Sequence, residues 1–93
     1  MSNQQCIEQL SPACFWDIDR ESFNMDKYPA FIIARVLEVG NVYDWKLLLD
    51  YYGIDRIAKE CMTLRQMHPR DLAFVAAMSG TNREDYKCYQ NKQ

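Results

Sequence analysis

The sequence predicts a small all-α protein, a bundle of about four short helices preceded by an irregular N-terminal arm. Apolar residues recur with helical spacing through the middle of the chain, and no segment alternates as a strand does. The three glycines and three prolines stand, with the exception of Pro12, at the ends of helical segments. With 93 residues, 48% apolar and 26% charged, the chain has the size and composition of one globular domain.

Three segments divide this domain: an N-terminal arm over 1–25, a helical core over 26–80 and a polar tail over 81–93. The arm contains several large apolar side chains but no sustained period. We therefore expect extended or single-turn structure laid across the bundle, with the first several residues loose. The tail is mostly polar, and three of its side chains are expected to attach it to the domain: Tyr86, Cys88 and Tyr89.

The first core helix is expected to run from a cap at Asp26 to Val39, where Gly40 closes it in a left-handed conformation. Pro29 falls in its first turn, where the missing N–H of proline is tolerated. The apolar side chains of this segment are Phe31, Ile32, Ile33, Val36 and Leu37.

The second helix is expected to begin after Asn41, a favourable N-cap residue, and to end at Gly53. Asp44 lies three residues after the cap, where a carboxylate interacts favourably with the positive end of the helix. Residues with i, i+3, i+4, i+7 spacing give this segment one apolar stripe, formed by Trp45, Leu48, Leu49 and Tyr52.

A third helix is expected from about Asp55, and a fourth over residues 69–79. The inner face of the third carries Ile54, Ile57, Ala58, Cys61 and Leu64. The fourth is introduced by His68 and Pro69, ends at Gly80, and contains the run LAFVAAM. Because this run is apolar on nearly all sides, we expect the fourth helix to be the most deeply buried.

Composition excludes several classes of protein. The longest apolar run, Leu72–Met78, is far too short to span a bilayer, and a net charge of −2 is not that of a strongly basic nucleic-acid binder. The N-terminus has no secretory pattern, so we expect a cytoplasmic protein with reduced thiols, a two-disulfide secreted domain being the less favoured alternative. The four cysteines match no zinc spacing, and we expect neither a metal nor a cofactor: Cys6, Cys14, Cys61 and Cys88.

Catalytic chemistry has few candidate residues. His68 is the single histidine, and its place before Pro69 favours helix entry over general-base catalysis. Asp17 and Asp19 are two residues apart, a spacing more typical of helix caps than of a metal site. No glycine-rich phosphate loop is present. We therefore expect a protein that is not an enzyme.

DNA binding is the alternative hypothesis. Two short helices meet at Gly53, as in a helix-turn-helix, and bases follow on the second helix and beyond it. The segment from Arg56 to Arg70 carries a formal charge of +3. The first of the two helices is rich in aromatic residues near the turn, where this motif requires small ones, and the overall charge is acidic. A DNA-binding regulator of transcription is therefore the less favoured of the two functional hypotheses.

Aromatic residues make up 13% of the chain, more than four short helices need for a core. Exposed aromatic side chains anchor protein interfaces, and nearby bases attract an acidic partner surface. We therefore expect a protein-interaction module, with binding residues of two kinds. Its anchors are Trp16, Tyr43 and Tyr51, and its basic residues are Arg56, Lys59, Arg65 and Arg70.

Five segments in order resemble a family of small, uncharacterised bacterial proteins. These segments are FWDID (15–19), FIIARVLEVG (31–40), DWKLLLDYYG (44–53), the proline-opened helix at 69–74 and EDYKCY (84–89). The residues that match the family pattern are Trp16, Asp17, Arg35, Gly40, Asp44, Trp45, Tyr52, Gly53, Pro69, Phe74, Cys88 and Tyr89. The chain departs from the family in having His-Pro where members often have Ser-Pro or Asp-Pro.

The resemblance implies a genomic context rather than a catalytic site. Members of that family are often encoded beside nucleotidyltransferase-type toxins of abortive-infection systems. By this resemblance the chain is expected to be the small, antitoxin-like regulatory partner of such a toxin, with nucleic acid as the alternative partner and no membrane association.

Overall fold

The computed structural model describes residues 2–90 and contains no strand within that range. The all-α fold class is confirmed. The four predicted core helices are all present, and shorter helical elements flank them. In chain order the elements are α1 (Asn3–Gln9), η1 (Pro12–Phe15), α2 (Pro29–Val39), α3 (Val42–Tyr52), α4 (Ile54–Met62), α5 (Pro69–Ser79), η2 (Arg83–Asp85) and α6 (Lys87–Gln90), where η marks a 3₁₀ helix.

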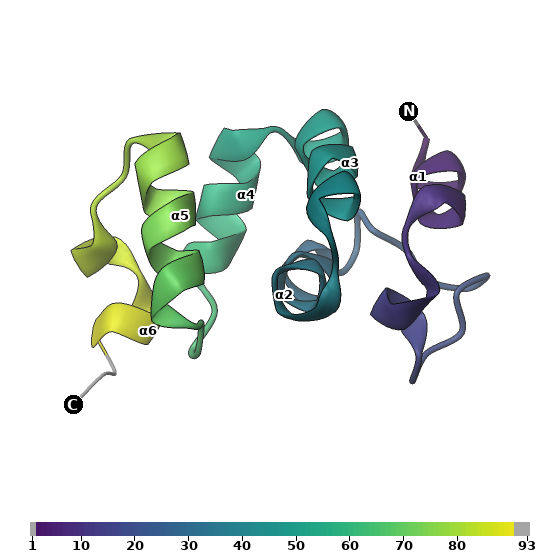
Figure 1. Ribbon diagram of the computed structural model, residues 1–93, viewed down its shortest axis with the longest axis horizontal. Helices are drawn as coiled ribbons and strands as arrows, with labels where there is room; N and C mark the ends of the chain where they lie inside the picture. The colour runs from purple at the N-terminus through teal and green to yellow at the C-terminus, as the bar shows by residue number, and fades with distance from the viewer. Residues whose placement is uncertain (1, 91–93) are drawn as a thin grey trace.

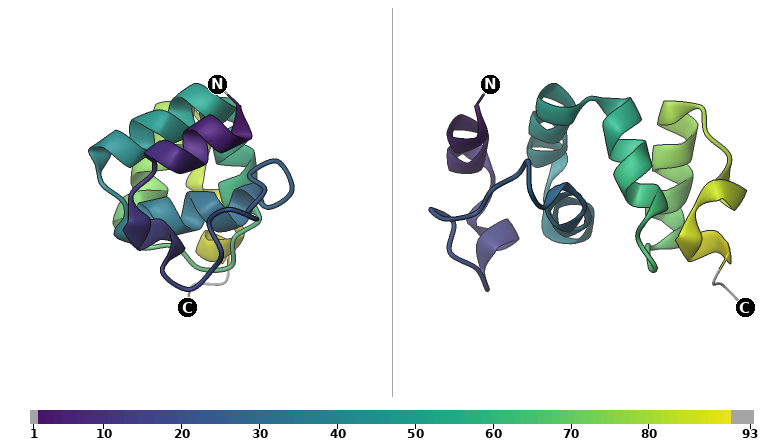
Figure 2. Two further views of the ribbon diagram at one scale, coloured as in Figure 1. Left: turned by 90° about the vertical axis from the view of Figure 1, so that its right-hand side faces the viewer. Right: turned by 180° about the vertical axis from the view of Figure 1, so that it is seen from behind.

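The helices follow one another along the long axis of a 38 × 24 × 22 Å molecule (Figure 1). Helix α1 lies at one end of this axis, and α5 and α6 lie at the other (Figure 2). Between them α2 packs on α3 and α4, α1 packs on α3, and α5 packs on α4. The core is continuous through all of these contacts. Its buried apolar residues are Cys6, Ile7, Leu10, Cys14, Phe15, Met25, Ile32, Ile33, Val36, Leu47, Leu48, Ile57, Ala58, Cys61, Leu72, Val75, Ala76, Tyr86 and Cys88.

The expectation that the first several residues are loose was wrong from residue 2 onward, because they form helix α1. Helix α1 begins with a capping box in which Ser2 and Gln5 exchange side-chain to backbone hydrogen bonds of 3.0 and 3.3 Å. Cys6, Ile7 and Leu10 are at most 1% exposed. The i, i+1, i+4 spacing of these three residues places them on one face of a helix. The segment is too short for this spacing to repeat, so no helical period was recognised in the sequence. After η1 the arm is irregular, as expected.

Asp44 joins the arm to α3. The N-cap expected at Asn41 is confirmed, and Asn41 and Asp44 form a reciprocal capping box at the start of α3. The same carboxylate, which is fully buried, also accepts a 3.0 Å hydrogen bond at Oδ1 from the backbone N–H of Ser11, 33 residues away. Its Oδ2 accepts from the Asn41 N–H at 3.1 Å. One carboxylate therefore caps a helix and fixes the arm against it.

Arg20 closes the end of α1. Its guanidinium donates to the backbone oxygen of Ile7 at 2.8 Å and to that of Glu8 at 3.3 Å, and it also donates to the oxygen of Leu10. The last carbonyls of a helix have no partner within the helix, and a cation there complements the helix dipole. The arm thus folds back so that its own arginine satisfies α1.

Helix α2 begins later than expected. Its N-cap is Tyr28 and Pro29 is its first residue, so the predicted cap at Asp26 was wrong. Asp26 instead accepts a 2.8 Å hydrogen bond from the Tyr51 hydroxyl. The predicted left-handed closure holds at Gly80 (φ 71°), whereas Gly40 is extended (φ −78°, ψ 171°).

Gly53 is the single residue between α3 and α4, and its backbone adopts φ 84° and ψ 155°. A side chain is strained at this φ, so glycine is required for so sharp a junction.

The expectation that α5 is the most buried helix was wrong. Only Leu72, Val75 and Ala76 of this helix are buried, whereas Phe74 is 45% and Met78 44% exposed. Because α5 lies at the end of the row of helices, only one of its faces meets the core (Figure 1).

The tail attaches as expected at two of its three residues. Tyr86 is fully buried with its hydroxyl 2.8 Å from the Thr81 hydroxyl, and Cys88 is 9% exposed. Tyr89 is 43% exposed. The last residues of the expected tail, 91–93, lie outside the described residues.

Candidate functional site

A series of aromatic rings with two cations lies along the arm and α2. The Arg35 guanidinium carbon lies 5.7 Å from the centre of the Trp16 ring and 4.9 Å from that of Phe31. Cations held over aromatic faces are attracted by the ring quadrupole. Trp16 is 75% exposed and Phe31 is 39% exposed, so two of these groups face solvent.

The same series continues beyond Phe31. The Phe31 and Phe23 ring centres are 5.7 Å apart, and those of Phe23 and Tyr28 are 6.1 Å apart. The Lys27 ammonium lies 5.7 Å from the Tyr28 ring, which is 50% exposed. We call this series the aromatic row. It consists of Trp16, Arg35, Phe31, Phe23, Tyr28 and Lys27.

An ion pair fixes the Trp16 end of the aromatic row. The Arg35 guanidinium donates to both carboxylate oxygens of Asp17, at 2.8 and 3.0 Å. The hydrogen bonds that Arg35 donates hold the pKa of Asp17 below its ordinary value, and the same hydrogen bonds raise the pKa of Arg35. Both groups are charged at neutral pH, and the bidentate geometry gives the arginine one orientation.

The sequence-predicted anchors do not form one site. Trp16 belongs to the aromatic row. Tyr43 is 58% exposed on the first turn of α3, with its hydroxyl 3.3 Å from Gln9 Oε1. Tyr51 is half-buried, bonded to Asp26 and packed edge-on against Tyr52 at a ring distance of 5.0 Å. Burial together with the Asp26 hydrogen bond raises the pKa of Tyr51 to about 12.

The basic residues of the predicted binding set also lie at two separate places. Arg56 forms a 3.0 Å ion pair with Glu60 and lies 5.9 Å from the Tyr52 ring, which brings it close to Tyr51. Lys59 is exposed on α4. These are the two bases of α4, the second helix of the pair around Gly53, and Arg56 is already paired with a carboxylate. DNA binding through this pair stays a prediction.

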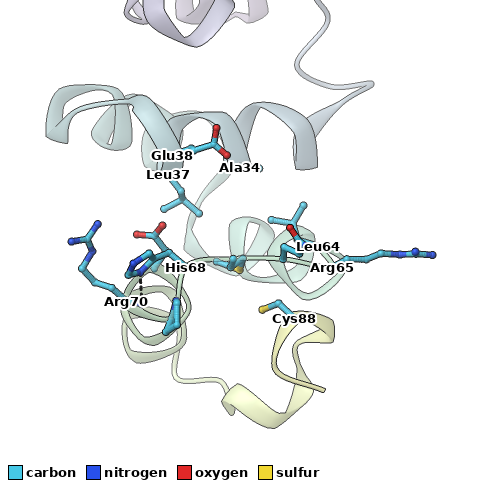
Figure 3. Close-up of a pocket in the computed structure, with 12 residues that line it drawn as sticks. Ala34, Leu37, Glu38, Leu64, Arg65, His68, Arg70 and Cys88 are labelled. Carbon is cyan, nitrogen blue, oxygen red and sulfur yellow. Dashed lines mark hydrogen bonds between the residues drawn. The ribbon is translucent and has the colours of Figure 1, made fainter. Parts of the chain in front are cut away.

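Arg65 and Arg70 flank a groove of about 630 Å³. Figure 3 shows Ala34, Leu37 and Glu38 of α2 on one side and the segment that contains His68 on the other. The two arginines extend toward opposite sides of the groove (Figure 3). His68 is the N-cap of α5, its Nδ1 accepting from the Arg70 N–H at 3.1 Å, which agrees with its expected helix-entry role.

The thiols lie in the core. All four cysteines are free and buried: Cys6, Cys14, Cys61 and Cys88. Burial raises the pKa of Cys6 to about 11 and that of Cys61 to about 12. Over residues 2–90 no group of three His, Cys, Asp or Glu side chains is placed to hold a metal ion. Nor does any helix in this range have the length and apolarity needed to cross a membrane.

Sequence reasoning missed most of the aromatic row. Phe31 was assigned to the core, and Tyr28, Phe23 and Arg35 were not singled out for binding. One signal was available. Arg35 follows Phe31 by four residues, the helical spacing at which two side chains meet on one face. The partners from the arm carry no such signal, because the fold alone brings Trp16 to α2.

The sequence pattern of a family of unknown function, DUF6922, matches residues 10–61, more than half of the chain. The chain belongs to this family. The matched range runs from the end of α1 through α4, and it contains the whole aromatic row and Asp44. It ends before the segment that forms the second side of the groove. No curated protein and no solved structure matches the chain.

Proposed function

We propose that this DUF6922 protein is a non-enzymatic protein-interaction module that binds its partner through the aromatic row. The observation that carries the proposal is the exposure of three aromatic rings on one surface: Trp16 at 75%, Tyr28 at 50% and Phe31 at 39%. Aromatic residues and arginine are the side chains most enriched at the energetic centres of protein interfaces. Exposed aromatic side chains gathered on one surface are typical of a docking site.

The aromatic row is also arranged before any partner arrives. Asp17 orients Arg35, and Arg35 lies against the rings on either side of it. Side chains held in one geometry lose less conformational entropy on binding than free ones. The row therefore offers apolar area without a large ordering penalty.

The proposed partner is a nucleotidyltransferase-type toxin, with this chain acting as its antitoxin-like regulator in a bacterial cytoplasm. Its support is the resemblance described above. Three residues of that resemblance, Trp16, Asp17 and Arg35, are the ones that meet at one end of the aromatic row. The family pattern and the proposed surface thus overlap at the Trp16 end of the aromatic row.

Co-expression with the neighbouring nucleotidyltransferase tests the proposal. The wild-type chain is expected to relieve toxicity and to co-purify with the enzyme after nuclease treatment. Trp16→Ala is expected to weaken binding about 30-fold, the effect of removing one interfacial aromatic anchor. Val42→Ala is the matched control, since Val42 is an apolar side chain 71% exposed outside the aromatic row.

Equal binding by the Trp16 and Val42 variants would contradict an interface at the aromatic row. Recovery of nuclease-sensitive material alone would instead favour the DNA-binding alternative. A gel shift on the upstream promoter that weakens steeply with salt would then support phosphate contacts by the bases near Gly53.

A further inference from the structure

We propose that the groove between α2 and the α4–α5 connection binds an extended peptide segment of a protein partner, with an apolar centre and an acidic residue at each end. The inference rests on the proposed function in that it requires a protein partner. It adds a second contact, separate from the aromatic row, and a stated chemistry for what occupies it.

The size and lining of the groove suit a short peptide. Its volume of about 630 Å³ falls within the range of ligand sites in proteins. Leu37 of α2 lies across from Leu64 and Met67 of the connection and from Pro69, the first residue of α5. These side chains form an apolar interior into which the central residues of a peptide can pack (Figure 3).

The backbone of the connection is open to pairing. Within the described chain, the N–H groups of residues 65–68 donate to no protein acceptor, and these residues belong to no helix. All four of these residues line the groove. An extended peptide can pair with such an unpaired backbone as it pairs with the edge of a sheet. This favours an extended occupant over a helical one.

Charge defines the ends of the occupant. Among the residues that the structure describes, Arg65 and Arg70 make no ion pair with a carboxylate. They extend toward opposite sides of the groove, so each is available to one end of a bound segment (Figure 3). Arginine binds carboxylates in a bidentate geometry, which gives register as well as attraction.

The same lining argues against nucleic acid. Glu38 and Asp71 also line the groove, and their carboxylates repel a continuous chain of phosphates. Isolated acidic residues at the ends of an apolar segment avoid that repulsion. A peptide is therefore the occupant that the charges favour.

The test uses the full chain and a peptide array. Heptapeptides carry Glu at both ends and every combination of Leu, Val, Ile and Thr in the centre, and a matched array carries Lys at both ends. The tightest Glu peptide is then titrated into ¹⁵N-labelled protein. We expect the backbone amides of 65–68 and Leu37 to shift, and the Arg65→Glu/Arg70→Glu variant to bind at least tenfold more weakly.

Lys46→Glu is the matched control, because Lys46 is an exposed base of α3 that does not line the groove. It is expected to leave peptide affinity unchanged. Retention of the amide spectrum outside the groove shows that each variant is folded. An empty Glu array, equal binding of the Lys array, equal loss in the control, or shifts at 65–68 caused only by an eight-nucleotide oligothymidine would each overturn the inference.

The outcome is separable from that of the aromatic row. Trp16→Ala is expected to bind the array peptide normally. Partner capture that depends on Trp16, together with an empty array, overturns the groove alone. Peptide binding in the groove, together with partner capture unaffected by Trp16→Ala, overturns the aromatic row alone.

Discussion

The two ends of the molecule are held in different ways. At the end that contains α1, polar side chains reach backbone groups far away in sequence, as Arg20 does for α1 and Asp44 for Ser11. Asn3 Oδ1 likewise accepts from the Met25 N–H at 2.7 Å, and the Tyr52 hydroxyl donates to the Met25 oxygen at 2.7 Å. These bonds give an irregular segment one defined course.

The α5 end depends on apolar packing and local caps. Val75 is fully buried, while the side chains of His68 and Ser79 bond only to groups within four residues of them in the sequence. Trp45 packs on Phe74 with ring centres 5.4 Å apart, and its buried indole N–H has no hydrogen-bond partner among residues 2–90. An arm without helical periodicity can therefore have as defined a course as a helix when its backbone groups have hydrogen-bond partners. An apolar run, in turn, need not be buried on every side.

The largest expected effect lies at Asp44. We predict that Asp44→Ala lowers the free energy of unfolding by about 3 kcal/mol, because it removes a fully buried carboxylate and leaves the partly buried backbone N–H groups of Ser11 and Asn41 without acceptors. Asp55→Ala is the control, since Asp55 is an exposed first-turn acid of α4. Its expected change is below about 0.5 kcal/mol. Urea unfolding followed by circular dichroism measures both, and equal effects would contradict the role of Asp44 at the arm.

Arg20 is next. We predict that Arg20→Gln lowers the free energy of unfolding by about 2 kcal/mol, because charged hydrogen bonds to the carbonyls of α1 are lost. Hydrogen exchange is expected to accelerate at the amides of α1 and not at those of α5. Uniform acceleration over the chain would show that α1 does not open separately.

A pair of substitutions on α5 sharpens the comparison at the other end. Val75→Ala is expected to lower the free energy of unfolding by about 2 kcal/mol, since it removes methyl groups from a fully packed core. Phe74→Ala, although it removes more atoms, is expected to lower it by about 1 kcal/mol, because the ring is 45% exposed. Thermal or urea unfolding ranks the two, and the reverse order would place Phe74 in the core.

The smallest stability effect is expected at Asp17. Its pKa in the folded protein is held below the ordinary 3.8 by the hydrogen bond from Arg35. The resulting stability is present above about pH 4 and is lost as the pH falls through the folded-state pKa. Asp17→Asn is therefore expected to unfold at slightly lower urea than wild type at pH 7, and the difference is expected to narrow as the pH falls below about 4. A difference that stays constant down to pH 2 would contradict the ion pair as its cause.

The core helices were predictable because their signals are local. Caps such as Asn41 and breakers such as Gly53 act within one turn, and the apolar stripe of α3 repeats within the helix. The arm was less predictable, since its course depends on hydrogen bonds across 33 residues for Asp44. The binding surface was hard to predict for the same reason. Trp16 was identified from composition, whereas its neighbours on α2 are known only once the arm is placed.

A photo-crosslinking comparison tests the central claim, that the aromatic row is the partner surface. A photoreactive phenylalanine replaces Tyr28 in one variant and Phe74 in another, two aromatic positions of similar exposure at 50% and 45%. On irradiation with the co-expressed nucleotidyltransferase, we predict a crosslink from position 28 and none from position 74. A crosslink from position 74 alone, or from neither, would contradict the account.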